Sequence, residues 1–344
     1  MKYSYLIEPY TLHFREPAGT SRGVYRERRI WLVRLKDAET GREGIGECAP
    51  LPHLSCDDLP DYEVVLHDAC ESLSASGKLN MAALRHYPSI LFGLETALQH
   101  VSRGTLRLFD TQFARGEVGI PINGLIWMGS FEEMNRRIEA KLSEGFRCIK
   151  LKIGAIGWDD ELSLLRKIRQ RYDRNTVELR VDANGAFSPD DALQRLNDLA
   201  LLDIHSIEQP IRAGQWSEMG SLCKKSPLPI ALDEELIGVN NSDEKQRLLD
   251  EIRPQYIIVK PSLHGGMEGT REWIKLAEQR NVGSWITSAL ESNIGLNAIA
   301  HLTASVYGSD ITMPQGLGTG ALYTNNVKLG EYSLAIDNCR LTII

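Results

Sequence analysis

The sequence predicts an α/β protein in which a small α+β domain precedes a closed barrel of parallel strands and helices. Three observations support this fold class. Up to about residue 116, strand-like segments come first and helical ones follow, which is typical of an α+β domain. Beyond it, extended apolar segments alternate with helical ones, as in a parallel sheet. Charged residues stand at the ends of successive extended segments, where a parallel barrel brings them to one rim.

The first domain is expected to span residues 1–116. Residues 30–36 alternate apolar and polar side chains with period two, and residues 44–48 are short and extended, so both are predicted to be strands. Residues 60–74 and 88–103 space their Leu, Val, Ala and Phe side chains at helical intervals.

The barrel is expected to span residues 117–325. Its strands are predicted at residues 120–124, 148–153, 177–182, 204–208, 230–233, 256–260, 284–288 and 312–316. Its helices are predicted at residues 131–144, 159–171, 189–202, 215–225, 242–252, 267–280 and 293–307. Successive strands that are separated by a helix run parallel, and about eight of them in about 200 residues fit a closed barrel. The remaining residues, 326–344, are expected to pack back on the first domain.

An open, doubly wound sheet is the alternative architecture. It would favour a glycine-rich phosphate-binding turn after the first strand. Here Asn123 and Gly124 are followed by Leu-Ile-Trp, which is not such a turn. The closed barrel is therefore the predicted fold.

Composition and charge limit the function. The chain has 344 residues, 42% hydrophobic and 25% charged, which excludes a disordered or fibrous protein. The net charge of -7 argues against a nucleic-acid partner, because that surface needs clustered Lys and Arg. No apolar run approaches the ~18 residues that cross a bilayer, the start does not resemble a signal peptide, and the cysteines lack metal or redox spacing. We expect a cytoplasmic protein with no membrane partner, and the sequence does not indicate an oligomeric state.

Charged and polar side chains mark the predicted ends of the barrel strands. Parallel strands deliver their carboxyl ends to one face of a barrel, so residues far apart in the sequence converge there. After the first pair, successive ends are about one strand plus one helix apart. They are Lys150, Lys152, Asp182, Glu208, Asp233, Lys260 and Ser288.

Three of these residues, Asp182, Glu208 and Asp233, are carboxylates from consecutive strands. With water completing an octahedron, their oxygens suit a hard divalent cation such as Mg²⁺. No His or Cys joins them, which disfavours Zn²⁺ because a zinc site normally recruits an imidazole or a thiolate. The histidines of the chain show no ligand spacing, and we interpret them as structural or exposed.

Lysines flank the carboxylates in chain order. Lys150 and Lys152 point to the same side of their strand, since side chains alternate along it. A free lysine titrates near ~10.4 and is a poor base at neutral pH, but neighbouring positive charges and a divalent cation lower its pKa. A lysine base beside a cation-bound carboxylate predicts proton abstraction next to that carboxylate, with the metal stabilising the dianion that forms.

Each feature also has a plainer interpretation. A lone acid at a strand end is commonly a helix cap or a surface charge. The two lysines alone would fit a solvated strand edge, and residues 182–185 alone would fit an Asx turn. The glycines of residues 316–320 resemble a phosphate cradle only weakly, and a flexible turn fits them as well. Six placements in register favour the functional interpretation.

These residues resemble the enolase superfamily, and in particular its muconate lactonizing enzyme subgroup. The matching segments are IKLKIG at 149–154, RVDANGAF at 180–187, SIEQPI at 206–211, ALDEEL at 231–236 and IVKPSLHGG at 258–266. The resemblance covers essentially the whole chain and implies a modified TIM barrel, (β/α)7β, with an N-terminal α+β capping domain. One departure is Glu235, where a serine is common in the family.

The resemblance also implies roles for the strand-end residues. The three carboxylates would bind Mg²⁺, with Mn²⁺ able to replace it, and a small-molecule carboxylate would be the substrate. Lys152 and Lys260 would lie on opposite faces of the substrate, and Lys150 would assist electrostatically. A Lys or His base beside Mg²⁺ is the general pattern of this superfamily.

Within the subgroup, SALESNIGL at 288–296 and GLGTGALY at 316–323 most resemble members that dehydrate a cyclohexadiene carboxylate bearing a succinyl group, giving an aromatic product. Lys152 would then remove the proton beside the carboxylate and return it to the departing hydroxyl, a syn elimination. Lys260 would face the enediolate as a fixed cation.

Other functions stay open. Muconate cycloisomerase and N-acylamino acid racemase chemistry would use the same metal site. Dipeptide epimerases usually carry Asp-x-Asp after the eighth strand, where this chain has Gly318-Thr319-Gly320, so that reaction is disfavoured. A metal-stabilised barrel that binds a small carboxylate without turning it over is the alternative outside enzymes.

Substrate discrimination is expected from the capping domain and the rim. Asn184, Ser288 and Gly318 are the candidate substrate-binding residues. Backbone N–H groups at the start of the helix at Asn293, predicted to be unpaired, would add donors for a second carboxylate. The small residues of 17–23 join two extended stretches. A plain hairpin loop fits them, and the resemblance favours a mobile flap over the barrel mouth.

Overall fold

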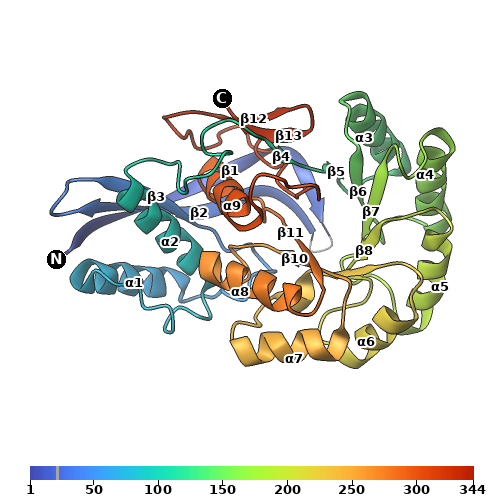
Figure 1. The fold of residues 1–344 in the computed structure, drawn as a ribbon, viewed down its shortest axis with the longest axis horizontal. Helices are drawn as coiled ribbons and strands as arrows, with labels where there is room; N and C mark the ends of the chain where they lie inside the picture. Colours follow the sequence, from blue (N-terminus) through green and yellow to red (C-terminus); the bar gives the residue numbers. More distant parts are fainter. Residues whose placement is uncertain (21–22) are drawn as a thin grey trace.

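The structure, a computed structural model, describes residues 1–20 and 23–344. Figure 1 shows two parts beside each other. The first third of the chain forms a sheet with helices packed against it, and most of the remainder forms a curved sheet surrounded by helices.

The first part contains an antiparallel sheet and a pair of helices on one face of it. Its elements are β1 (Tyr3–Thr20), β2 (Gly23–Asp37), β3 (Glu43–Cys48), α1 (Tyr62–Ser76) and α2 (Pro88–Arg103), and the sheet order is β1-β2-β3. Trp31, Val33 and Leu35 of β2 pack against both helices in one buried cluster. α1 begins and ends two residues later than the helix predicted over 60–74. Its end is set by Gly77, whose φ of 70° is left-handed.

A pair of glycines lets α2 lie directly on β3. A Cβ atom at Gly46 would stand 1.8 Å from the carbonyl oxygen of Gly93, and one at Gly93 would stand 2.3 Å from the sulfur of Cys48. Any larger residue at either position would push the helix off the strand. This contact fixes the position of β3, including Glu47 next to Gly46.

The second part is a curved sheet of parallel strands in the order β11-β10-β9-β8-β7-β6-β5. They are β5 (Gly124–Ile126), β6 (Cys148–Lys152), β7 (Glu178–Asp182), β8 (Ser206–Glu208), β9 (Ile230–Leu232), β10 (Tyr256–Val259) and β11 (Gly283–Ile286). Their apolar side chains and those of the surrounding helices form the largest buried cluster. The predicted modified barrel after an α+β domain is confirmed.

The predicted last strand, 312–316, is reduced to single bridges. Gln315 pairs with Ile122 and Gly316 pairs with Thr287, both in parallel. Because Ile122 precedes β5 and Thr287 follows β11, these bridges close the ring between its edge strands.

The predicted first barrel strand, 120–124, is wrong as a single element. β4 (Ile120–Pro121) pairs antiparallel with β13 (Arg340–Ile343), whereas β5 begins only at Gly124. The two elements share one apolar stretch, so periodicity does not separate them. Only their different pairing partners do.

Helices follow the barrel strands and surround the sheet (Figure 1). They are α3 (Phe131–Ser143), α4 (Trp158–Arg171), α5 (Pro189–Ala200), α6 (Trp216–Lys225), α7 (Ser242–Ile252), α8 (Gly266–Glu278) and α9 (Asn293–Tyr307). Each predicted helix is confirmed, with ends that differ by two residues at most. Among residues 1–20 and 23–344, no helix combines the length and apolar composition needed to span a bilayer.

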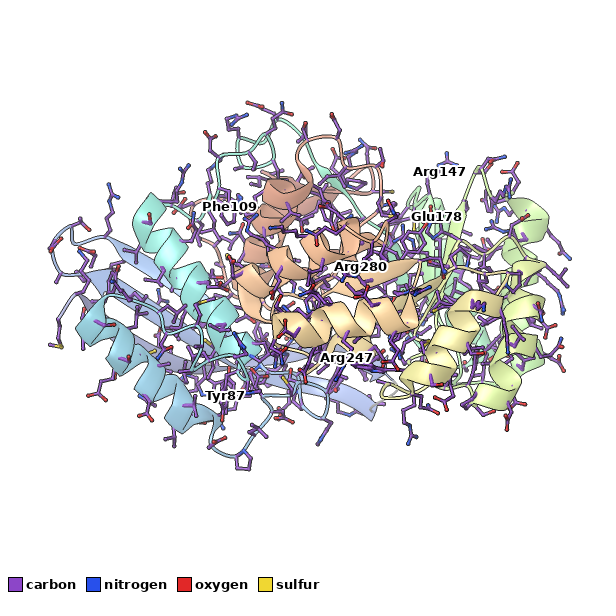
Figure 2. All side chains as sticks on the ribbon, turned by 60° about the horizontal axis from the view of Figure 1, so that its bottom comes forward. Tyr87, Phe109, Arg147, Glu178, Arg247 and Arg280 are labelled. Carbon is purple, nitrogen blue, oxygen red and sulfur yellow. The ribbon has the colours of Figure 1, made fainter. Side chains whose placement is uncertain are left out.

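Side chains fill the space between the sheet and the helices (Figure 2). On the outside, Arg280 after α8 pairs with Asp250 of α7 at 2.8 Å, and Arg247 of α7 lies over the ring of Trp216 in α6. Toward the first part of the chain, α8 packs against α2 and α9 packs against β3. The first part of the chain therefore docks on the last barrel helices.

The C-terminal segment, 326–344, contacts both parts. β12 (Leu334–Asp337) pairs with β13, which pairs with β4 beside the barrel. Tyr332 donates its hydroxyl to the carbonyl of Leu106 at 2.9 Å and packs against the cluster around Leu12 of the first sheet. The segment therefore links the two parts of the chain.

Candidate active site

A cleft lies where the carboxyl ends of the barrel strands face the first part of the chain. It encloses about 860 Å³, including its open mouth. We call its two sides the charged floor and the apolar wall. The charged floor comprises Lys150, Lys152, Asp182, Glu208, Asp233 and Lys260, of which Glu208 and Asp233 lie just beneath the surface. The apolar wall comprises Tyr25, Leu51, Leu54, Leu125 and Trp127.

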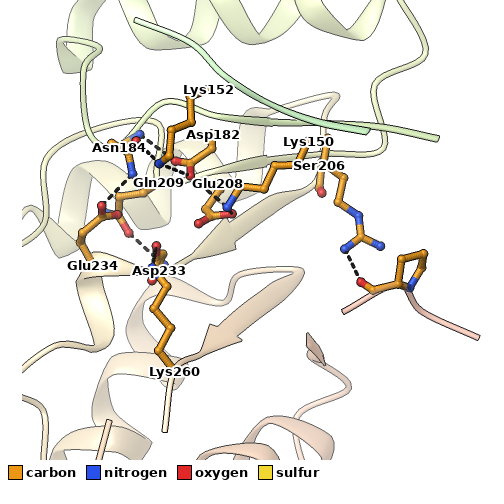
Figure 3. Close-up of polar contacts among 12 residues, drawn as sticks. Lys150, Lys152, Asp182, Asn184, Ser206, Glu208, Gln209, Asp233, Glu234 and Lys260 are labelled. Carbon is orange, nitrogen blue, oxygen red and sulfur yellow. Dashed lines mark hydrogen bonds and ion pairs between the residues drawn. The ribbon is translucent and has the colours of Figure 1, made fainter. Parts of the chain in front are cut away.

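The lysines of β6 reach the carboxylate at the end of the next strand. The register pairs Lys152 with Asp182, so their side chains leave neighbouring strands on the same face. Lys150 Nζ lies 2.9 Å from Asp182 Oδ2 and also pairs with Glu208. Lys152 Nζ lies 3.0 Å from the same Asp182 oxygen and donates to Asn184 Oδ1 at 2.7 Å (Figure 3).

Lys260 approaches from the other side of the carboxylates. It follows β10 and forms an ion pair with Asp233, which follows β9 and is completely buried. Figure 3 shows Lys152 and Lys260 extending toward the carboxylates from opposite directions. The structure thus brings together all six residues that the sequence predicts for the metal and the lysine positions.

The buried charges shift one another's pKa. Burial raises the pKa of Glu208 well above its usual range, and the charge of Asp182 adds to the rise. Burial acts on Asp182 too, but Lys150 and Lys152 hold its pKa below its usual value. Burial lowers the pKa of Lys150, yet the carboxylates outweigh it and raise that pKa, and Lys260 behaves in the same way. The lowered lysine pKa inferred from the sequence depends on a bound cation and stays a prediction.

The carboxylates offer the ligands that a hard divalent cation needs. Glu208 Oε1 and Asp233 Oδ1 are buried without a hydrogen-bond partner among the described residues. In residues 1–20 and 23–344, no three His, Cys, Asp or Glu side chains converge closely enough to hold a metal ion. Lysine ammonium groups pair with the three carboxylates instead. An all-oxygen donor set with unpartnered buried oxygens fits Mg²⁺.

Gln209 and Glu235 support the floor from behind. The side-chain oxygen of Gln209 accepts the backbone N–H groups of Asp233 and Glu235, each at 3.2 Å, and its amide donates to Glu235 Oε2 at 2.9 Å. Glu235 also accepts the N–H of Gly214 at 2.7 Å. Glu235, the departure from the family's serine, therefore joins the loops after β8 and β9 and is not among the residues that line the cleft.

The predicted substrate-binding residues lie at the cleft. Asn184 lines it and donates to Glu234 Oε1 at 2.9 Å, and Gly318 lines it without a side chain. The Ser288 hydroxyl also lines it, but it donates to Glu291 Oε2 at 2.6 Å and accepts the hydroxyl of Thr319 at 2.9 Å. Their contact with a substrate stays a prediction.

The prediction of unpaired N–H groups at the start of α9 is wrong. The N–H of Asn293 donates to Asn326 Oδ1 at 2.8 Å, and the next two N–H groups donate to Ser292 Oγ and Glu47 Oε2. Asn326 and Glu47 come from distant parts of the chain, which a local helix signal does not reveal.

Sequence reasoning missed the apolar wall and Glu234. Leu125 lies in β5 and Trp127 directly follows it, so a correct position for this strand identifies both. Leu51 and Leu54 lie in a loop of the first part and carry no local signal of a site. Burial, with the charge of Asp233, raises the pKa of Glu234 to about 7.

The flap predicted over residues 17–23 is only partly described. Residues up to Thr20 belong to β1 and pair with the start of β2, which is the hairpin alternative. Ser21 and Arg22 lie outside the described residues.

Comparisons with known proteins agree with this geometry. The family model described as "Enolase C-terminal domain-like" matches residues 133–316, and that described as "MenC, N-terminal domain" matches residues 10–101. The o-succinylbenzoate synthase of Desulfotalea psychrophila is 48% identical over 361 residues, with 95% of each chain covered.

Solved structures extend the comparison to the whole chain. The crystal structure of MenC from Desulfotalea psychrophila has a TM-score of 0.82 at 42% identity and covers 99% of this chain and 100% of that one. The o-succinylbenzoate synthase of Thermosynechococcus elongatus, complexed with Mg in the active site, has a TM-score of 0.75 at 26% identity and covers 96% of both chains. The chain belongs to the enolase superfamily, in the muconate lactonizing subgroup that includes the o-succinylbenzoate synthases.

Proposed function

We propose that this chain is an o-succinylbenzoate synthase of menaquinone biosynthesis. It dehydrates 2-succinyl-6-hydroxy-2,4-cyclohexadiene-1-carboxylate to 2-succinylbenzoate. The observation that carries the proposal is the pair of lysines, Lys152 and Lys260, reaching a buried acidic group from opposite sides beneath a cleft. The 48% identity to a synthase of that name supports the choice of reaction.

The metal position is assigned to Asp182, Glu208 and Asp233. Their oxygens would hold Mg²⁺, which supplies positive charge to the carboxylate dianion that forms when the neighbouring proton leaves. Mn²⁺, also bound by oxygen ligands, would replace it. Lys150, paired with Asp182 and Glu208, keeps the acidic residues from repelling one another.

The lysines divide the proton chemistry. Lys152, as the neutral amine, takes the proton beside the ring carboxylate and returns it to the hydroxyl that departs as water on the same face. The C–H and C–O bonds break, a ring double bond forms and the product is aromatic. Lys260 stays protonated on the opposite face, where it faces the enediolate as a fixed cation.

The apolar wall suits the ring of this substrate. Tyr25, Leu51 and Leu54 from the first part and Trp127 from the barrel offer an apolar surface opposite the charged floor. A cyclohexadiene ring that carries its carboxylate on one edge would place the carboxylate on the floor and the ring against the wall.

The test is ultraviolet monitoring of the cyclohexadiene substrate with the protein and Mg²⁺. We expect a Mg²⁺-dependent absorbance change that stops when a chelator is added and returns with excess Mg²⁺ or with Mn²⁺. No absorbance change at high protein concentration would remove the synthase assignment and leave the superfamily membership intact.

N-acylamino acid racemization is a second candidate, because Lys152 and Lys260 lie on opposite sides of the acidic residues. A racemase needs one lysine as a base and the other as an acid in each direction. The 48% identity to an o-succinylbenzoate synthase favours dehydration over racemization. Incubating one enantiomer of an N-succinylamino acid in D₂O separates the candidates, since only racemization forms the deuterated opposite enantiomer and abolishes the optical rotation.

We further propose that the protein works in the cytoplasm. Every cysteine of the described chain is a free thiol, which is typical of a reducing compartment. No nucleic-acid or membrane partner is proposed.

A further inference from the structure

The loop between β11 and α9 forms one side of the cleft mouth, and it is held mainly by residues outside it. Ser288, Ala289 and Leu290 line the cleft. We call residues 288–292 the rim segment. Leu290 has a φ of 69°, in the left-handed region that a leucine rarely adopts. Such a conformation is energetically unfavourable and persists only where the surroundings hold it in place.

Glu47 of β3 holds the end of the rim segment. One carboxylate oxygen accepts the N–H of Ser292 at 2.9 Å, and the other accepts the N–H of Gly295 at 2.9 Å and the hydroxyl of Ser292. Glu47 is 0% exposed. A buried carboxylate that accepts three donors at a helix N-terminus is a strong attachment, because hydrogen bonds and the helix dipole both favour its charge.

A glycine in the first turn of α9 leaves room for this carboxylate. A Cβ atom at Gly295 would stand 3.0 Å from Glu47 Oε2 and 2.6 Å from the Cβ of Glu291. Only glycine at this position lets the carboxylate of the first part approach the helix so closely.

Arg28 of β2 holds the middle of the rim segment. Its guanidinium donates to the carbonyl of Ala289 and to the carbonyl of Ala49 in the first part. Arg28 is 1% exposed, and its charge favours the ionised form of Glu47, which burial opposes. Tyr323 donates its hydroxyl to the carbonyl of Leu290. The strained residue is thus fixed on both sides.

A second carboxylate of the first part provides a comparison. Glu95 of α2 accepts the N–H groups of Met267 and Glu268 at the start of α8. A Cβ atom at Gly266 would stand 2.2 Å from Glu95 Oε2, as tight a fit as at Gly295. The loop just before α8, residues 261–265, does not line the cleft among the described residues. Glu95 therefore joins the two parts without touching the cleft wall.

We propose that Glu47, supported by Arg28, is a positioning residue for substrate binding: it fixes the strained rim segment against the cleft through Ser292 and Gly295. Its partners are in the barrel, so the fit of the substrate depends on how the first part docks. This inference rests on the proposed synthase activity.

The experiment compares Glu47→Gln with Glu95→Gln in the full-length protein. Each change replaces one buried carboxyl group at one helix start between the same two parts, so both are expected to lower Tm by similar amounts. At a temperature well below either Tm, we expect Glu47→Gln to raise KM for the cyclohexadiene substrate about tenfold with kcat changed less than threefold, as loss of uniform binding predicts. Glu95→Gln should leave KM within twofold. Glu47→Asp, which keeps the charge but is one methylene shorter, should recover part of the KM effect.

A merely structural role for Glu47 would give a different result. If both variants lower Tm and neither moves KM, or if both move KM alike, the positioning role is wrong. If the wild-type protein itself shows no turnover, the proposed function fails and the kinetic comparison does not apply.

A second pair of variants covers the case in which Glu47→Gln does not fold. Ser292→Ala removes one donor to Glu47 and the N-cap of α9, and Asn241→Ala removes the N-cap of α7, which accepts the N–H of Glu244 at 2.9 Å. Each loss should lower Tm by a similar, small amount. We expect a KM increase of about threefold or more for Ser292→Ala alone, and equal KM values in the two variants would overturn the inference.

Discussion

The two sides of the cleft are built in different ways. The charged floor comes from the ends of neighbouring parallel strands, where the register alone brings Lys152, Asp182 and Glu208 side by side. The apolar wall comes mainly from the first part of the chain, whose position depends on contacts such as those of Glu47 and Glu95 with barrel helices. The comparison indicates that the barrel supplies the chemistry, whereas the docking of the two parts supplies the shape that selects a substrate.

The largest expected effect is on the floor. Lys152→Ala removes the proposed base and should lower kcat by about 10³-fold, within the range of general base catalysis. The fold should survive, since Lys150 still pairs with Asp182. Turnover by ultraviolet absorbance and Tm by calorimetry check both statements. Lys167→Ala, an exposed lysine of α4 that donates to Asn135, is the control and should change neither. Normal turnover by Lys152→Ala would refute the assignment of the base.

A proposed metal ligand, Asp233, should affect both activity and stability. Asp233→Asn should raise the Mg²⁺ concentration for half-maximal activity and lower turnover by about 10²-fold. It also leaves Lys260 buried without its counter-charge, which costs about 3 kcal/mol. Mg²⁺ titrations and urea unfolding measure the two effects. Asp250→Asn, which breaks an exposed pair with Arg280, should cost less than about 1 kcal/mol. An unchanged Mg²⁺ requirement in Asp233→Asn would contradict its place as a ligand.

The apolar wall should act on binding instead. Leu54→Ala removes part of the surface opposite the floor and should raise KM about tenfold while kcat stays within about threefold. Steady-state kinetics separate the two constants. Leu59→Ala, a more exposed residue (43%) of the same loop, should leave both unchanged. A large fall in kcat with constant KM would show that the wall takes part in chemistry.

The smallest expected effect is a pH dependence of docking. Burial raises the pKa of Glu95 from 4.5 to about 7, so the folded protein holds a proton there that the unfolded chain releases. Stability should therefore fall as pH rises from about 4.5 to 7, by up to about 3 kcal/mol from this group. Glu95→Gln should lack this loss. The unfolding free energy is measured against pH for the wild type and the variant. If it falls equally in both, the raised pKa of Glu95 is wrong.

The floor could be predicted because its information is local. Each of its residues ends an apolar run, and the helix between two runs fixes the spacing, so strand periodicity places Asp182, Glu208 and Asp233 at one rim. The same reasoning fails where strands are short or where two strands share one apolar stretch of sequence. Residues 120–124 divide between β4 and β5, and 312–316 pair only at single residues.

The apolar wall and the rim segment could not be predicted because their information is long-range. Leu51 and Leu54 sit in an irregular loop, and nothing in their neighbourhood distinguishes them from core leucines. Glu47 binds a helix start almost 250 residues later in the chain. A helix N-terminus in the sequence shows unpaired N–H groups, but it does not show which distant carboxylate will cover them.

The single bridges that close the barrel have a consequence for substrate entry. The edge between β11 and β5 is joined only through Gln315 and Gly316 in the described residues, whereas β8, in the middle of the strand order, lies across the ring from it. Gln315 accepts the N–H of Asn123 and donates to the carbonyl of Pro121, and Gly316 accepts the N–H of Ser288 and donates to the carbonyl of Ile286. Because Gly316 and Gly318 also line the cleft, the closure of the ring and the outline of the cleft mouth depend on the same short stretch of chain.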